Sequence, residues 1–123
     1  MTSNVTRVVL PVSPTAARTA RHIVAERCAA WDRDLIETAQ LLTSELVTNA
    51  VIHGRSHVQL KVTFDNGRLR VDVTDDNSRH PQPQPLDADA LDGRGLQIVQ
   101  LLAARWGVDD QPIGKRVWFE LTE

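Results

Sequence analysis

Two stretches of alternating apolar and polar residues, joined by a short turn, constrain the fold more than any other feature of the sequence. The turn is Asp65-Asn66-Gly67-Arg68, which is typical of a tight hairpin. The alternating apolar positions are Val58, Leu60, Val62 and Phe64 before the turn, and Leu69, Val71 and Val73 after it. Because successive side chains of a strand lie on opposite faces, each stretch forms a strand with one apolar face. Other segments must therefore cover this face of an antiparallel sheet.

Three segments with apolar residues at helical spacing can provide that cover. We expect helices over residues 13–31, about 35–54 and about 96–106, of which the second is the most regular. The first helix is expected to begin at Ser13-Pro14, a cap followed by proline. The second is expected to be capped by Asp32 or Asp34 and to end at Gly54. The third is expected to follow Gly93-Arg94-Gly95 and to end at Trp106, before Gly107. The chain thus supplies a helical layer for the sheet.

Short apolar stretches predict further strands at residues 5–12, from Val108 onward and at residues 117–121. The expected order is a strand, two helices, two strands, a long loop, a helix and two strands. Because hairpins pair the strands and helices cover one face, we predict an α+β fold, a two-layer sandwich with a mostly antiparallel sheet. The 123 residues (1–123) form one domain, with a lid loop over about residues 76–92.

The composition excludes several classes of function. Fourteen Lys and Arg against sixteen Asp and Glu give a net charge of −2, so no net positive field attracts nucleic acid. Cys28 is the only cysteine, which excludes an internal disulfide and a cysteine-based metal cluster; we expect it to be a buried structural thiol. No stretch approaches the roughly 18 apolar residues of a membrane span, and a signal-peptide pattern is missing. We expect a cytoplasmic protein without nucleic-acid or membrane partners.

Three polar residues lie four positions apart on the second predicted helix: Glu45, Asn49 and His53. Four residues make slightly more than one turn, so these side chains form a stripe beside the apolar stripe and at the edge of the core. Polar groups in that position need partners, which makes the stripe a candidate site. Periodicity alone leaves a solvated helix flank as the alternative. A zinc site from His53 and His57 is disfavoured because no third ligand is evident.

Two further features are weak signals when taken alone. Asp75 follows a strand and opens the long loop, where a carboxylate can accept a hydrogen bond from an exocyclic amine or simply cap the loop. Gly93-Arg94-Gly95 precedes a helix, whose free N–H groups can bind phosphate. The dinucleotide fingerprint is not met, because Ile98 occupies the position of its third glycine.

Together these features resemble the ATP-binding fold of histidine kinases, gyrase and MutL, the GHKL superfamily. They resemble most closely its small stand-alone branch, the bacterial anti-sigma factor serine/threonine kinases. The resemblance covers nearly the whole chain and rests on four motifs in order: Glu45-Leu-Val-Thr-Asn49-Ala-Val-Ile-His53-Gly54, Val71-x-Val73-x-Asp75, Gly93-Arg94-Gly95-Leu96-x-Ile98-Val99, and Gly114-Lys115-x-Val117-Trp118-Phe119. The first pattern is specific for this branch.

The resemblance implies ATP and Mg²⁺ as cofactors. It implies that Asn49 ligates Mg²⁺ through its amide oxygen, that Glu45 accepts the proton of an attacking hydroxyl, and that Asp75 binds the adenine amine. The other nucleotide-binding positions that it implies are Gly93 and Gly95 for the phosphates, Arg94 as a charge partner, and His53, Leu96 and Gly114. The sequence departs from the family pattern at Asn77, Arg79 and Arg116, which are expected to narrow the nucleotide pocket or weaken its affinity.

The resemblance also implies partners. It predicts a kinase that phosphorylates a Ser or Thr of an anti-sigma factor antagonist protein and that binds a sigma factor. The three departures leave a second interpretation, a regulator that binds a partner without kinase activity. The short apolar stretch at residues 5–12 further suggests a homodimer formed through the first strand.

Overall fold

A computed structural model describes residues 4–53, 57–76 and 91–123, with side chains for all of these except His53 and residues 91–96. The elements are β1 (Asn4–Pro11), α1 (Ala16–Arg27), α2 (Arg33–His53), β2 (His57–Asp65), β3 (Arg68–Asp75), α3 (Leu91–Leu102), β4 (Arg105–Asp110) and β5 (Lys115–Thr122). Their order is the one predicted from the sequence. The strands form one sheet in the order β1-β2-β3-β5-β4, and every neighbouring pair is antiparallel.

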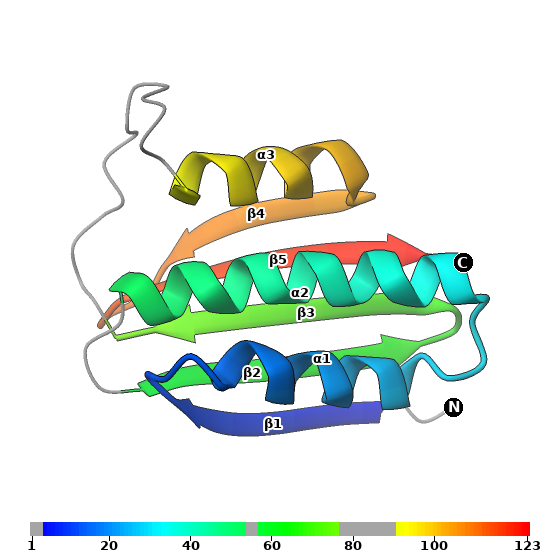
Figure 1. Cartoon of the computed structure of the whole chain (residues 1–123), viewed down its shortest axis with the longest axis horizontal. Helices are drawn as coiled ribbons and strands as arrows, with labels where there is room; N and C mark the ends of the chain where they lie inside the picture. The colour runs from blue at the N-terminus through cyan, green and yellow to red at the C-terminus, as the bar shows by residue number, and fades with distance from the viewer. Residues whose placement is uncertain (1–3, 54–56, 77–90) are drawn as a thin grey trace.

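The three helices form a single layer on one side of the sheet (Figure 1). The alternation in β2 and β3 places Val58, Leu60, Val62, Leu69, Val71 and Val73 on the side of the helices, and all six are buried. Leu42 of α2, Val24 of α1 and Phe119 of β5 complete the core between the layers. The predicted α+β two-layer sandwich is therefore confirmed. We call the helix-covered side of the sheet the inner face and the opposite side the outer face.

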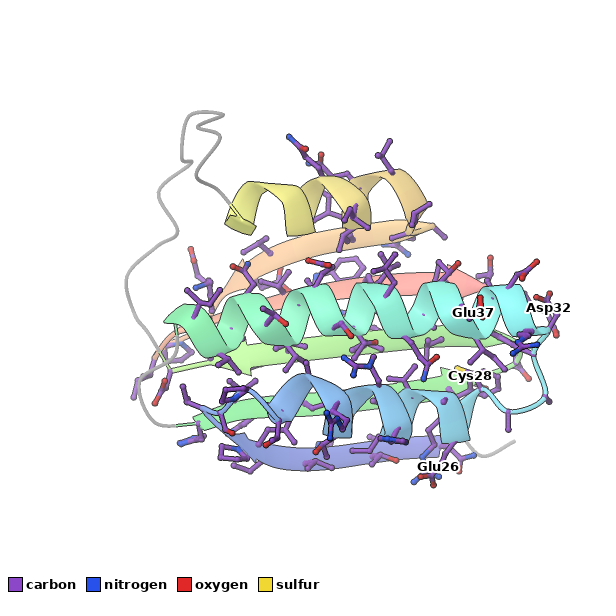
Figure 2. All side chains as sticks on the ribbon, in the orientation of Figure 1. Glu26, Cys28, Asp32 and Glu37 are labelled. Atoms are coloured by element: carbon purple, nitrogen blue, oxygen red, sulfur yellow. The ribbon has the colours of Figure 1, made fainter. Side chains whose placement is uncertain are left out.

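Local sequence signals explain the turn between β2 and β3 and the start of α2. Asn66 and Gly67 both have positive φ values, 52° and 73°, as a two-residue hairpin turn between twisted strands requires. Asp32 Oδ1 accepts a hydrogen bond of 2.9 Å from Leu35 N–H and caps α2, as the sequence predicted. Figure 2 shows Asp32 at the start of this helix.

The first helix is shorter than predicted at both ends. It begins at Ala16 because Ser13 forms a turn before it, with its Oγ accepting from Thr15 N–H and its carbonyl accepting from Ala16 N–H. It ends at Arg27, although the apolar pattern continues to Trp31. Trp31 is buried against Phe64, with ring centroids 5.5 Å apart, so tertiary packing and not the helix explains this apolar residue.

The third helix also ends earlier than predicted, at Leu102. Trp106 and Gly107, which were expected to end the helix, lie in β4 opposite Phe119 and Trp118 of β5. A Cβ atom at Gly107 would stand 2.8 Å from the Trp118 indole, so this glycine allows the ring to lie flat against the neighbouring strand. The glycine is a packing requirement of the sheet and not a helix stop.

Two expectations about composition can be compared with the described residues. Cys28 is buried at the end of α1 (Figure 2), and burial raises the pKa of its thiol to about 11. It is thus the inert structural thiol that the sequence predicted. The described helices include none that is long and apolar enough to cross a membrane.

Candidate functional site

The candidate site lies at the end of the sheet where β3 ends and β5 begins. Asp75 is the last residue of β3 and is paired in register with Val58 of β2 and Lys115 of β5. Only three residues separate the end of α2 at His53 from the start of β2, so α2 must end near this part of the sheet (Figure 1). The topology thus brings Asn49, one turn before His53, to the same end of the molecule as Asp75.

Helix α2 carries Glu45 and Asn49 at the edge of the core. The buried residues Leu42, Leu46, Val47 and Ala50 surround them in sequence, whereas Glu45 and Asn49 themselves are half-buried. The helix packs on β2, β3 and β5 and also on α3. The Asn49 amide oxygen is buried, which excludes the alternative of a fully solvated helix flank at that residue. The predicted position of the polar stripe is correct for these two residues, and the side chain of His53 lies outside the described residues.

The Asn49 amide oxygen has an unusual environment. Its Oδ1 atom is buried and accepts no hydrogen bond within the described residues. A buried acceptor without a donor costs about 1–3 kcal/mol, so such an atom points to a missing partner. A hard cation satisfies a neutral amide oxygen well. No group of three or more His, Cys, Asp or Glu gathers among the described residues, so a metal here would draw most of its ligands from elsewhere. This donor set fits Mg²⁺ held mainly by phosphates and water.

Glu45 lies one helical turn before Asn49 and is also half-buried. It takes part in no ion pair or side-chain hydrogen bond within the described ranges. A carboxylate in this condition has its oxygen atoms available to accept a proton or a hydrogen bond. The pair of Glu45 and Asn49 therefore offers a proton acceptor beside an oxygen ligand.

Asp75 is almost fully buried, with 3% of its surface exposed, and faces the helices. Its Oδ2 atom is 2.9 Å from Nζ of Lys115, which is itself 5% exposed. The two residues lie directly opposite each other in the β3–β5 register. A buried charge is stable only when it is paired, so each residue of this ion pair depends on the other.

The sequence reasoning missed the role of Lys115. The residue was included in the last glycine motif without a function. The signal that could have revealed it is the register of two strands far apart in sequence, which places the ammonium beside the carboxylate. Any ligand that bound the Asp75 carboxylate would share it with a protein cation.

The close approach of the backbone near Asp75 requires a glycine at position 114. Its φ is +90°, a left-handed conformation that favours glycine, and an added Cβ would stand 1.9 Å from the Asp75 carbonyl oxygen. The turn before β5 can approach the end of β3 this closely only without a side chain. Gly114 thus sets the position of Lys115 and hence of the buried ion pair.

A shallow hollow of about 260 Å³ lies beside Asp75, lined by His57, Gln59, Thr74, Asp75, Asp76 and Ile113. These residues come from the sheet and the turn before β5, and α2 contributes none of them. The helix that carries Asn49 therefore takes no part in forming this hollow.

The glycines of the third motif lie inside α3 and not before it. The helix begins at Leu91, so its free N–H groups belong to the first four residues, 91–94, and Gly95 is already in the second turn. Gly93 and Arg94 fall within that first turn, whereas Gly95 and Leu96 do not. The side chains of residues 91–96 lie outside the description, as do residues 77–90 of the predicted lid with Asn77 and Arg79.

Arg116, expected from the sequence to narrow the nucleotide pocket or weaken its affinity, does not lie on the helix-covered side of the sheet. It lies on the outer face, where its guanidinium is 2.8 Å from Asp109 and 3.7 Å from Asp72. The one-residue offset between Lys115 and Arg116 reverses the face, because successive strand residues point to opposite sides. Lys115, and not Arg116, is the cation that reaches the candidate site.

Comparisons with known proteins agree with this architecture. Residues 10–121 match the family described as histidine kinase-like ATPase domain. A search of curated proteins gave no significant match. One similar solved structure is that of the RsbU and RsbW domains of Rv1364c from Mycobacterium tuberculosis, with 20% identity and a TM-score of 0.72.

That structural alignment covers 97% of this chain but 32% of the other, so the chain spans about a third of its structural relative. At this identity the similarity shows a common fold and no more. The family match extends over nearly all elements, from the end of β1 to the end of β5. The chain therefore belongs to the histidine kinase-like ATPase family.

Proposed function

We propose that this protein binds Mg-ATP and transfers the γ-phosphate to a Ser or Thr of an anti-sigma factor antagonist protein, and that it also binds a sigma factor. The observation that carries the nucleotide part is the buried, unpartnered Asn49 Oδ1 one turn after Glu45. Family membership supports ATP binding. The partner proteins rest on the motif resemblance of the sequence alone.

In this mechanism Asn49 would hold the metal through its amide oxygen. Magnesium, when bound, neutralises charge on the phosphate oxygens and so favours transfer. Glu45 orients the attacking hydroxyl of the partner protein and takes its proton. Asp75 accepts a hydrogen bond from the base amine, while the Lys115 ammonium balances the negative charge of the Asp75 carboxylate. These steps draw on side chains from α2, β3 and β5.

Titration calorimetry tests the binding step with the parent protein, Asn49→Ala and a control, Thr48→Ala. Thr48 is the exposed neighbour of Asn49 on the same helix, so its loss should leave binding unchanged. We expect the parent and Thr48→Ala to bind Mg-ATP and Asn49→Ala to lose the part of binding that depends on Mg²⁺. Equal binding by Asn49→Ala would contradict the proposal.

A transfer assay with radiolabelled ATP and a candidate antagonist protein tests the chemistry. Glu45→Gln should keep nucleotide binding and lose about 10²–10⁴-fold in transfer rate, the usual contribution of a positioned acid or base. Unchanged transfer by Glu45→Gln would remove Glu45 from the mechanism without affecting the binding proposal.

The buried Lys115–Asp75 pair favours a second candidate, a partner-binding module without kinase activity. In that case Lys115 occupies the carboxylate that a base would need. The same transfer assay separates the two candidates, because label on the antagonist protein would exclude the inactive module.

A further inference from the structure

The outer face of the sheet is not covered by any helix of the described chain (Figure 1). The registers of the four strand pairs arrange its side chains in three rows that cross all five strands. The rows are Val5-Thr63-Arg70-Glu120-Arg105, Arg7-Lys61-Asp72-Trp118-Gly107 and Val9-Gln59-Thr74-Arg116-Asp109. Charged residues are frequent in all three rows, so the arrangement of charge decides what this face can bind.

Within the three rows, the part of this face formed by β3, β5 and β4 is internally compensated. Arg70, Arg105 and Arg116 form a network of five ion pairs with three acids: Arg70–Asp72 at 3.0 Å, Arg70–Glu120 at 3.3 Å, Arg105–Glu120 at 3.6 Å, Arg116–Asp109 at 2.8 Å and Arg116–Asp72 at 3.7 Å. Asp72 and Glu120 are buried beneath this network. The Arg70 guanidinium also stacks over the Trp118 ring, 4.0 Å from its centroid.

In the half formed by β1 and β2, the cations Arg7 and Lys61 are not compensated by an ion pair within the described residues. Arg7 and Lys61 lie directly opposite each other across the two strands. Neither forms an ion pair with a residue in the described ranges. Asp72 is the next residue in their row, but it already pairs with Arg70 and Arg116. Like charges directly opposite each other disfavour strand pairing, so this arrangement calls for an external anion.

A hollow of about 400 Å³ lies over these two cations. Its lining includes Arg7, Val9, Gln59, Lys61, Thr74 and Arg116. Since Arg116 and Asp72 neutralise each other, Arg7 and Lys61 leave an excess of two positive charges. The neighbouring outer-face residues of β1 are apolar and exposed, Val5 by 43% and Val9 by 64%. The surface therefore combines two unpaired cations with an apolar border.

We propose that this surface binds an acidic segment of a partner protein, in which carboxylates contact Arg7 and Lys61 and apolar side chains cover Val5 and Val9. Charge complementarity selects an acidic partner, and the exposed valines favour a protein segment over a free phosphate ion. A nucleic acid would meet Asp109 on the same face, and the chain has a net charge of −2. A second copy would bring another Arg7 and Lys61 to the contact.

The test uses a short peptide of alternating glutamate and valine, with a serine–valine peptide, inorganic phosphate and a single-stranded oligonucleotide as comparison probes. Chemical shifts of the backbone amides of the ¹⁵N-labelled full chain report where each probe binds. The variant is Arg7→Gln/Lys61→Gln. Its matched control is Arg18→Gln/Arg27→Gln, which removes two exposed charges from α1 in the helical layer.

We expect the acidic peptide to shift amides of β1 and β2 in the parent and in the control. Arg7→Gln/Lys61→Gln should bind it about tenfold more weakly, as the loss of two exposed charge pairs implies. Equal binding of the serine–valine peptide, or of the acidic peptide by the double variant, would overturn the proposal. So would stronger binding of phosphate or the oligonucleotide at these residues, or a dimer in sedimentation that buries them in the free protein.

Discussion

The inner and outer faces of the sheet handle charge in opposite ways. On the inner face Lys115 and Asp75 form one ion pair, and both partners are nearly inaccessible to water. On the outer face three arginines and three acids share five contacts, with several of the side chains still partly exposed. A charged residue therefore indicates a binding site under different conditions on the two faces. On the inner face any charged residue is a candidate, whereas on the outer face only a charged residue without a compensating ion pair is one.

The largest expected effect comes from breaking the inner pair. Lys115→Met leaves the Asp75 carboxylate buried without its counter-ion, so we expect the free energy of unfolding to fall by about 3–5 kcal/mol. The double variant Lys115→Met/Asp75→Asn removes both charges and should recover most of that loss. Urea unfolding measures both. A single variant as stable as the parent would show that the inner face tolerates an unpaired charge.

The next effect concerns the turn that positions Lys115. Gly114→Ala places a Cβ against the Asp75 carbonyl oxygen, whereas at Gly67, which also has a positive φ, the nearest atom is 3.7 Å away. We expect Gly67→Ala to cost about 1–2 kcal/mol for its left-handed conformation, and Gly114→Ala to cost clearly more. Thermal unfolding of the two variants compares them directly. Equal losses would mean that the contact with Asp75 relaxes easily.

A smaller effect, of opposite sign, is expected at Asn49. Asn49→Leu removes the unpartnered amide oxygen and should raise the free energy of unfolding by about 1 kcal/mol while abolishing Mg²⁺-dependent nucleotide binding. Denaturant unfolding without nucleotide and calorimetry with Mg-ATP measure the two properties. A variant that loses stability in the absence of nucleotide would show that the amide oxygen has a partner within the protein.

The smallest effect sharpens the description of the outer face. Arg7→Glu, on the edge strand, replaces a like-charge pair with an opposite-charge pair across β1 and β2 and should stabilise the free protein by about 0.2–1 kcal/mol. The gain should shrink at high salt, because both side chains are accessible to solvent. No gain at low salt would mean that Arg7 and Lys61 do not repel each other measurably.

Local patterns in the sequence predicted most of the fold. The hairpin at Asn66 and Gly67 and the cap of α2 at Asp32 follow from short-range geometry, so they could be read directly. The ends of α1 and α3 could not, because Trp31 and Trp106 continue the apolar spacing while their packing places them outside the helices. An apolar residue that follows a helix looks the same in sequence as one that belongs to it.

The candidate site was predicted only as far as its residues lie near each other along the chain. Glu45 and Asn49 share one helix, and their spacing was sufficient to place them together. Lys115 reaches Asp75 through the pairing of two strands forty residues apart in sequence, a relation that no local pattern contains. For the same reason the face of the sheet on which Arg116 lies could not be predicted. When site residues come from different strands, their contacts can be predicted only once the strand register is known.

Trp118 gives the outer face a built-in optical reporter. The guanidinium groups of Arg70 and Arg105 both lie over its indole. Trp118 is in the same row as Lys61 and is separated from it by Asp72 alone. The emission of an indole depends on nearby charge, and the other two tryptophans, Trp31 and Trp106, do not lie in these rows. A carboxylate that binds near these charged residues should therefore change the fluorescence of Trp118, so binding can be followed without a label on the protein.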